Sequence, residues 1–307
     1  RQSGEALKQY SEWLKGLFGK TLFPGSVAVV DSAHGAASSI AGEIFSESGL
    51  DVRSIGNCPD GLNINEGVGV MHMPHLASAI TSNEARFGIA LDGDADRVLL
   101  ADSKGRVLDG DIMLWVLARW LQEKGTLGSC VVSTVMSNLA LEERLRECDI
   151  TLTRCPVGDR YVLDGMKKSN SRLGGEQSGH IILHQHVHTG DGLCTALNFL
   201  KGCEELGEDL DTLVDRFGRF PQVLKNLRVE TKAGLLENET VKKAIKDGEE
   251  RLGLQGRVFV RMSGTEPLVR VLVEARDESA LFEVSEQILD TIKAVGAGCF
   301  PEGGRQG

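Results

Sequence analysis

The chain has 307 residues, of which 41% are hydrophobic and 25% are charged, a composition typical of a globular protein with two or three domains. Its formal net charge is −10, which argues against a nucleic-acid or anionic-membrane surface, so we expect neither kind of partner. No apolar run is long enough to span a bilayer, and from the opening residues we expect no signal peptide.

The seven cysteines are scattered and form no C-x-x-C pair, which predicts reduced thiols and a cytoplasmic protein. The chain begins with Arg1 rather than Met, and its first segment has the pattern of a helix already under way. We therefore expect it to be a piece of a longer protein.

The first hundred residues alternate between helix and strand patterns. Leu7, Tyr10, Leu14 and Leu17 recur at helical spacing and predict an opening helix. Strands are expected over 26–30, 51–55, 87–91 and 98–101. One further helix is expected between the first of these strands and Gly49, and another over 75–81. This alternation favours a mainly parallel sheet with helices on its faces.

The alternation then repeats, and a smaller unit follows it. The repeat predicts helices over 111–122, 138–147, 191–206 and 209–217, and strands over 130–134, 150–154 and 181–182. Beyond a linker at 220–222, strands are expected over 226–230, 257–262 and 268–275, with helices over 237–251 and 278–295. The predicted fold class is α/β: two similar domains with mixed or parallel sheets (1–103 and 104–220), then a smaller α+β domain (221–307).

Three aspartates stand between two apolar strands, where Asp92, Asp94 and Asp96 precede Arg97. Carboxylates this close together repel one another, and a hard divalent cation relieves the repulsion. In an open sheet, ligands bind at the carboxyl ends of the strands, where this loop is expected to lie. The pattern predicts a metal site for Mg²⁺ or Ca²⁺.

This loop has three other interpretations. A plain Asp/Gly hairpin turn is the simplest. An EF-hand is excluded, because its sixth and twelfth positions would hold Arg97 and Ser103 instead of Gly and Glu. An aspartyl phosphatase, with Asp92 as nucleophile, stays open but fits the third Asp and the Arg less well.

Ser32 and His34 follow the first predicted strand and raise the question of a nucleophilic serine. No G-x-S-x-G elbow surrounds Ser32. These side chains are expected to serve the strand-to-helix turn.

Glu176, Ser178 and His180 occupy alternate positions of a glycine-flanked loop and should share one face if the loop is extended. A carboxylate, a hydroxyl and an imidazole suit the hydroxyls of a sugar, which both donate and accept hydrogen bonds. His180 could also move a proton near neutral pH. A polar turn with a structural histidine is an equally good interpretation.

The stretch from Arg261 to Pro267, with Arg270 beyond it, is the candidate phosphate site. Arginine presents a two-pronged donor to phosphate oxygens, while Ser263, Thr265 and the Gly264 amide add short donors. The alternative is a hairpin turn with exposed arginines. Arg160 is a weaker candidate, which by itself fits a solvated helix-start residue.

Taken together, the motifs resemble those of the α-D-phosphohexomutases. Asp-Gly-Asp-Ala-Asp-Arg, Gly-Glu-Gln-Ser-Gly-His and Arg-Met-Ser-Gly-Thr-Glu-Pro occur here in that family's order, and Gly61–Asn65 and Thr189–Gly192 resemble two further signatures. The resemblance covers nearly the whole chain. It implies the second, third and fourth of four domains around a central cleft, the fourth being a small α+β lid.

The resemblance also implies roles for individual residues. Asp92, Asp94 and Asp96 would hold Mg²⁺, and Arg97 would brace a phosphoserine. Glu176 and Ser178 would hold sugar hydroxyls, with Arg160 and His180 beside them. The phosphate clamp would consist of Arg261, Ser263, Gly264, Thr265 and Arg270.

The implied reaction moves a phosphate between positions 6 and 1 of a hexosamine, through a phosphoserine and a 1,6-bisphosphate, with glucosamine phosphate as the best match. The family's serine loop, close to Thr-Ala-Ser-His-Asn-Pro, does not occur in this sequence. We therefore expect a chain that is inactive alone. A mannose or glucose phosphate substrate and a non-catalytic sugar-phosphate binder remain alternatives, and the sequence leaves monomer and homodimer open.

Overall fold

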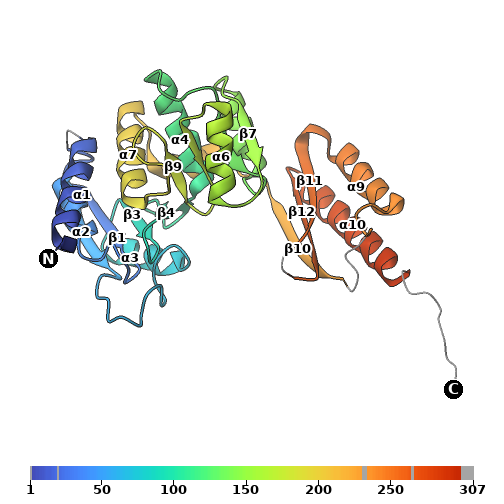
Figure 1. Cartoon of the computed structure of the whole chain (residues 1–307), viewed down its shortest axis with the longest axis horizontal. Helices are drawn as coiled ribbons and strands as arrows, with labels where there is room; N and C mark the ends of the chain where they lie inside the picture. The colour runs from blue at the N-terminus through green and yellow to red at the C-terminus, as the bar shows by residue number, and fades with distance from the viewer. Residues whose placement is uncertain (1, 19–20, 230–233, 264–265, 299–307) are drawn as a thin grey trace. The chain divides into compact units, whose positions relative to one another are not determined.

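The computed structural model describes residues 2–18, 21–229, 234–263 and 266–298 (Figure 1). The chain divides into two bodies, Arg1–Gly218 and Arg219–Gly307, which are treated separately below. In the described part of the chain, no helix has the length and apolar character needed to cross a bilayer.

The first body contains a mixed sheet in the order β2-β1-β3-β4-β5. β1 pairs in parallel with β2 and β3, whereas β3–β4 and β4–β5 are antiparallel. Its strands are β1 (Val27–Asp31), β2 (Asp51–Ile55), β3 (Phe87–Leu91), β4 (Val98–Ala101) and β5 (Val107–Leu108). Every residue of β3 is buried, which explains its unbroken apolar sequence.

A second sheet repeats this arrangement, in the order β7-β6-β8-β9. β6 pairs in parallel with β7 and β8, and β8 pairs antiparallel with β9, so β6 to β9 correspond to β1 to β4. Its strands are β6 (Val131–Thr134), β7 (Leu152–Cys155), β8 (Leu173–Gly175) and β9 (Ile181–Leu183). The turn between β3 and β4 and the turn between β8 and β9 therefore occupy equivalent places.

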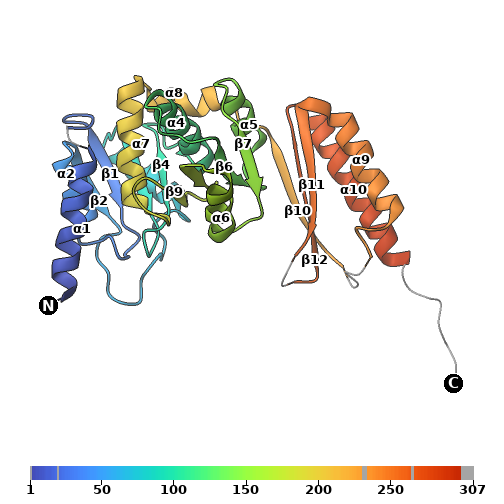
Figure 2. The ribbon, with the colours of Figure 1, turned by 45° about the horizontal axis from the view of Figure 1, so that its top comes forward.

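Helices α4 and α7 form the apolar centre of the first body. Each has eleven buried residues, and α7 lies between the two sheets in both views (Figures 1 and 2). α4 contacts β5 and β8, and α7 contacts β3, β4 and β9, so each helix touches both sheets. The helices of this body are α1 (Gln2–Phe18), α2 (Ala41–Glu47), α3 (Met73–Ser82), α4 (Gly110–Glu123), α5 (Leu139–Arg146), α6 (Asp159–Ser169), α7 (Gly192–Leu206) and α8 (Leu210–Phe217).

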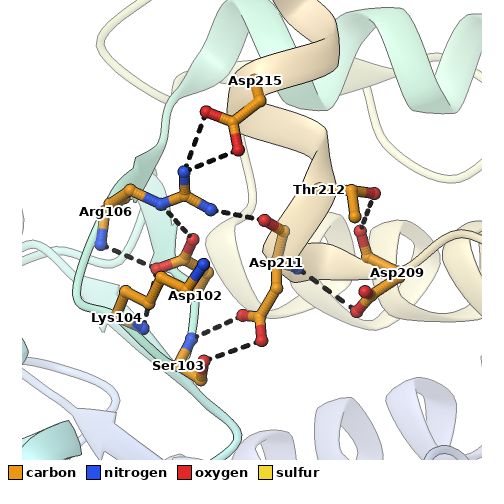
Figure 3. Close-up of polar contacts among 8 residues, drawn as sticks. All are labelled: Asp102, Ser103, Lys104, Arg106, Asp209, Asp211, Thr212 and Asp215. Carbon is orange, nitrogen blue, oxygen red and sulfur yellow. Dashed lines mark hydrogen bonds and ion pairs between the residues drawn. The ribbon is translucent and has the colours of Figure 1, made fainter.

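A polar cluster also ties the turn after β4 to helix α8 (Figure 3). The fully buried Asp102 accepts hydrogen bonds from the Lys104 and Arg106 amides and from Arg106 Nε, the last at 2.7 Å. Arg106 also bonds both carboxylate oxygens of Asp215, and Ser103 donates two bonds to Asp211. The two α/β repeats are thus joined by charged contacts as well as by apolar packing.

The second body is an antiparallel sheet in the order β10-β12-β11, packed against α9 and α10. Alternate β12 residues Val269, Val271 and Val273 enter its core beside Val284 and Ile288 of α10. Its elements are β10 (Gln222–Arg228), α9 (Glu239–Leu252), the short helix η1 (Gly253–Gln255), β11 (Gly256–Met262), β12 (Leu268–Ala275) and α10 (Glu278–Gly298).

The predicted fold class is confirmed: two similar mixed sheets in α/β arrangement precede an α+β unit. The predicted boundaries differ in places. β10 begins at Gln222, inside the expected linker, and β8 includes Gly174 and Gly175, the glycines that flank the predicted polar loop. The domain limits at residues 103 and 220 stay a prediction.

Candidate functional site

The three aspartates lie at the carboxyl end of β3, in an acidic loop that comprises residues 92–97. Asp92 is buried, Asp96 is half-buried and Asp94 is exposed. Ala95 adopts a left-handed conformation with φ of 61°, which turns the chain back into β4. The turn brings one oxygen of each aspartate to within 4.8 Å of the other two.

Arg97 fixes the innermost of these carboxylates. Its backbone amide donates to Asp92 Oδ1 at 3.1 Å, and its Nε donates to Asp92 Oδ2 at 2.7 Å. Its Nε also lies 3.7 Å from Asp96 Oδ1. Because Asp92 is 2% exposed and both its oxygens accept from Arg97, this geometry disfavours Asp92 as a phosphatase nucleophile.

The electrostatics of the acidic loop favour a bound cation. Burial raises the pKa of Asp96, the Asp92 and Asp94 carboxylates raise it further, and His180 opposes them. A divalent ion reverses such a balance by favouring the charged forms. Carboxylate oxygens at this spacing fit Mg²⁺, which prefers oxygen ligands.

The equivalent turn between β8 and β9 forms a polar loop, residues 176–180. Glu176 Oε1 accepts a hydrogen bond from the Gly158 amide at 3.1 Å, which brings the start of α6 next to this loop. Arg160, on the first turn of α6, is exposed, and so is Ser178. The structure thus places Arg160, Glu176 and Ser178 in one region of the first body.

His180 connects the polar loop to the acidic loop. The imidazole is 5% exposed, and its Nδ1 lies 3.1 Å from Asp96 Oδ2. The Gly190 amide donates to Nε2 at 3.1 Å. Because an amide can only donate, Nε2 accepts and the ring proton lies on Nδ1, facing Asp96. His180 thus orients an expected metal ligand.

The amino ends of the two central helices each donate a hydrogen bond to one of the two loops. The Gly110 amide at the start of α4 donates to Gln177 of the polar loop, at 3.0 Å. The Gly192 amide at the start of α7 donates to Ala95 of the acidic loop, at 2.8 Å. Both helices belong to the second repeat, which thus supports the acidic loop of the first repeat as well as its own polar loop.

A pocket of about 250 Å³ lies beside the acidic loop. Asp94 and Asp96 line one part of it, and Tyr10 and Asp191 line another. Apolar side chains, among them Ile40 and Leu193, complete the wall.

The second body contains the candidate phosphate residues. Arg261 on β11 and Arg270 on β12 are directly opposite in the antiparallel register. Like charges opposite each other repel, and an anion would relieve this repulsion. Glu266 lies 3.7 Å from Arg270 Nη2, while the buried Arg270 Nε has no hydrogen-bond partner among the described residues.

Ser263 shapes the turn beyond the arginine pair, Arg261 and Arg270. It is 4% exposed, its amide donates to the Leu268 carbonyl at 2.8 Å, and its hydroxyl accepts from the Glu266 amide at 3.3 Å. The other two predicted clamp residues, Gly264 and Thr265, lie outside the described residues.

Sequence reasoning missed the side-chain partner of Asp191, which lines the pocket beside the acidic loop. Asp191 was visible as the first residue of a predicted helix, but its side chain also accepts from Tyr10, 181 positions earlier. No local pattern indicates a contact of that separation. Ser32 is buried in the turn after β1, as expected of a structural residue.

Three models of one family match the chain in order. They are described as phosphoglucomutase/phosphomannomutase alpha/beta/alpha domain II over 25–105, alpha/beta/alpha domain III over 109–220 and C-terminal domain over 224–291. Their order agrees with the motif order in the sequence.

Two of the curated relatives that the chain resembles are named phosphoglucosamine mutases. The chain is 44% identical to phosphoglucosamine mutase 2 of Shewanella amazonensis over 297 residues, which are 96% of this chain and 66% of the relative. It is 42% identical to phosphoglucosamine mutase of Halalkalibacterium halodurans over 94% of this chain and 65% of the relative. The chain therefore spans slightly less than two thirds of these relatives.

Solved structures share the fold at low identity. A phosphoglucomutase/phosphomannomutase family protein from Burkholderia thailandensis matches with a TM-score of 0.80 and 22% identity, over 95% of this chain and 65% of that one. An N-acetylphosphoglucosamine mutase of Aspergillus fumigatus, in complex with GlcNAc-6P and magnesium, matches with a TM-score of 0.73 and 19% identity. The match covers 92% of this chain and 69% of that one.

Proposed function

The chain belongs to the phosphoglucomutase/phosphomannomutase family, and from this premise we propose that it carries the metal-, sugar- and phosphate-binding parts of a phosphoglucosamine mutase. Such an enzyme interconverts glucosamine 6-phosphate and glucosamine 1-phosphate. A phosphoserine transfers its phosphate to the free sugar hydroxyl, and the resulting 1,6-bisphosphate returns the other phosphate to the serine.

One observation carries the proposal: the acidic loop and the polar loop are joined by the His180–Asp96 hydrogen bond. A carboxylate cluster for a cation thus lies beside a set of groups suited to sugar hydroxyls. In this proposal Asp92, Asp94 and Asp96 hold Mg²⁺, which when bound offsets negative charge on the transferring phosphate.

The polar groups of the first body are assigned to the sugar. Glu176 and Ser178 bind hydroxyls, and Arg160 supplies positive charge near them. Glu176 is already fixed by the Gly158 amide, so its second oxygen is oriented before a ligand arrives. His180 keeps Asp96 in place, and Arg97 braces the phosphoserine.

The second body is assigned to the substrate phosphate. The arginine pair provides the charge, and Ser263, Gly264 and Thr265 provide short donors. Within the part of the chain that the structure describes, the buried Arg270 Nε has no hydrogen-bond partner, and this supports the assignment because such a donor favours an incoming acceptor.

Reduced thiols at the six cysteines that the structure describes agree with a cytoplasmic enzyme.

Calorimetric titration with Mg²⁺ present tests the proposal. Glucosamine 6-phosphate should bind at least about tenfold more tightly than glucosamine, because only the phosphate engages the arginine pair. Equal affinity for both would contradict the phosphate assignment. Tighter binding of glucose or mannose 6-phosphate would instead favour the phosphoglucomutase or phosphomannomutase alternative.

A second candidate function is sugar-phosphate binding without catalysis. It applies if the full protein carries no serine loop of this kind outside the 307 residues, which do not contain one. The two candidates predict the same binding and differ in turnover.

A further inference from the structure

The hydrogen bonds that fix the acidic loop continue beyond His180. The Gly190 amide that donates to His180 Nε2 immediately precedes Asp191, the N-cap residue of α7. A Cβ at residue 190 would lie 2.5 Å from both Asp96 O and His180 Cε1, so the backbone packs tightly against both loops. The position of Asp191 thus determines where the Gly190 donor lies.

Asp191 is held from two sides. Its Oδ1 accepts from the Cys194 amide at 2.9 Å, as an N-cap side chain does. The Tyr10 hydroxyl lies 2.9 Å from Oδ1 and 2.8 Å from Oδ2. Tyr10 comes from α1, which packs against α7, so a separate helix fixes this N-cap.

We propose that Tyr10 is a positioning residue for the metal site, and this inference rests on the proposed binding of Mg²⁺ by the acidic loop. The Tyr10 hydroxyl orients Asp191, the Gly190 amide fixes the His180 ring, and the ring orients Asp96. Partners that orient metal ligands typically change metal affinity by 10–100-fold when they are removed, and the effect weakens with each further step.

The pocket beside the acidic loop makes the hydroxyl of Tyr10 the informative group. Tyr10 and Asp191 line this pocket together with Asp94 and Asp96. Phenylalanine at position 10 keeps the ring and its contact with Trp13, where the centroids are 5.7 Å apart, and removes only the hydrogen bonds.

The test compares Tyr10→Phe with Tyr161→Phe, since the chain has only these two tyrosines. Mn²⁺ is the probe, because it takes the same oxygen ligands as Mg²⁺ and is followed by electron paramagnetic resonance. We expect Tyr10→Phe to weaken Mn²⁺ binding about 3- to 10-fold and Tyr161→Phe to change it less than 2-fold.

Two further comparisons separate the inference from its premise. Asp94→Asn should weaken Mn²⁺ binding more than Tyr10→Phe does. Unchanged binding in Asp94→Asn would overturn the metal site and the inference together. A clear loss in Asp94→Asn with no change in Tyr10→Phe would overturn only the role of Tyr10.

Asp191 provides a rescue experiment. Asp191→Asn keeps an oxygen that accepts from Tyr10 and from the Cys194 amide, so Mn²⁺ affinity should stay within about 2-fold of wild type. Asp191→Ala should weaken it about as much as Tyr10→Phe or more. Thermal unfolding of each variant is the control: a lower melting temperature with unchanged Mn²⁺ affinity would show a structural role alone and overturn the inference.

Discussion

At the scale of single residues, the arginine pair gives the sharpest test of phosphate binding. Arg261→Ala removes one charge-assisted contact and should weaken glucosamine 6-phosphate binding by about 1.5–3 kcal/mol. Calorimetry measures this loss. Arg251→Ala, which removes the same charge from α9, is the matched control and should leave binding unchanged.

Unchanged affinity in Arg261→Ala would mean that the residues around Ser263 form only a hairpin turn. Glucosamine without phosphate provides a second check, because its binding should not depend on Arg261.

The sequence predicted some of these residues for clear physical reasons. Asp92, Asp94 and Asp96 were found because alternate carboxylates are costly without a cation. The orientation of His180 could not be predicted, because both of its ring partners come from distant segments, Asp96 84 positions earlier and Gly190 ten later. Residue type indicated a polar loop but did not indicate which atom faces which partner.

At the scale of elements, the turn after β4 depends on Arg106. Arg106→Met would leave the buried Asp102 carboxylate without its charged partner, although two backbone amides still donate to it. We expect the free energy of unfolding to fall by about 2–4 kcal/mol, as measured by urea denaturation.

A double-mutant cycle checks this reason. If the cost of Arg106→Met comes from the unpaired carboxylate, the same change in an Asp102→Asn background should cost clearly less. Additive losses from the two substitutions would show that the Arg106–Asp102 contact contributes little by itself.

A second contact between elements predicts a dependence on pH. Burial would raise the pKa of Glu208, but hydrogen bonds and charges from Arg119 of α4 and Arg216 of α8 outweigh burial and lower it. A carboxyl with a lowered folded-state pKa stabilises the protein above its unfolded pKa, about 4.3, and this stabilisation is lost as pH falls through the folded value.

Glu208→Gln should therefore be less stable than wild type at pH 7, and the difference should shrink as pH falls from 5 towards 3. Urea denaturation at several pH values measures it. Glu123→Gln, an exposed change at the end of α4, is the control. Its free energy of unfolding should depend on pH in the same way as that of wild type. A Glu208→Gln difference that stays constant with pH would contradict the role of the Glu208 charge.

The order of the elements was predictable, whereas some of their limits were not. Apolar periodicity located most helices and strands. Gly174 and Gly175 suggested a loop, but they lie in β8, where the Met166 side chain and the His180 carbonyl come close enough to favour glycine. Such close packing is a tertiary property, and a single sequence does not reveal it.

At the scale of the whole molecule, the sequence predicts binding without turnover. The 307 residues contain metal, sugar and phosphate candidates but not the family's serine loop, and a mutase of this type needs a covalent phosphate carrier. A coupled assay for glucosamine 1-phosphate with Mg²⁺ should show no activity of this chain, and added 1,6-bisphosphate should not restore it.

A longer chain that includes the family's serine loop is the positive control and should be active in the same assay. Robust turnover by the 307 residues alone would show that one of their own side chains carries phosphate. It would also revive the phosphatase alternative.

The support that α4 and α7 give to the two loops has a thermodynamic consequence. Because α4 supports the polar loop, α7 supports the acidic loop and His180 joins them, order imposed on one loop is transmitted to the other. Mg²⁺ and the sugar should then bind with positive cooperativity, and linkage requires the effect to be reciprocal. The factor by which bound sugar phosphate raises the affinity for Mg²⁺ must equal the factor by which bound Mg²⁺ raises the affinity for the sugar phosphate. The occupancies of the two ligands therefore rise together.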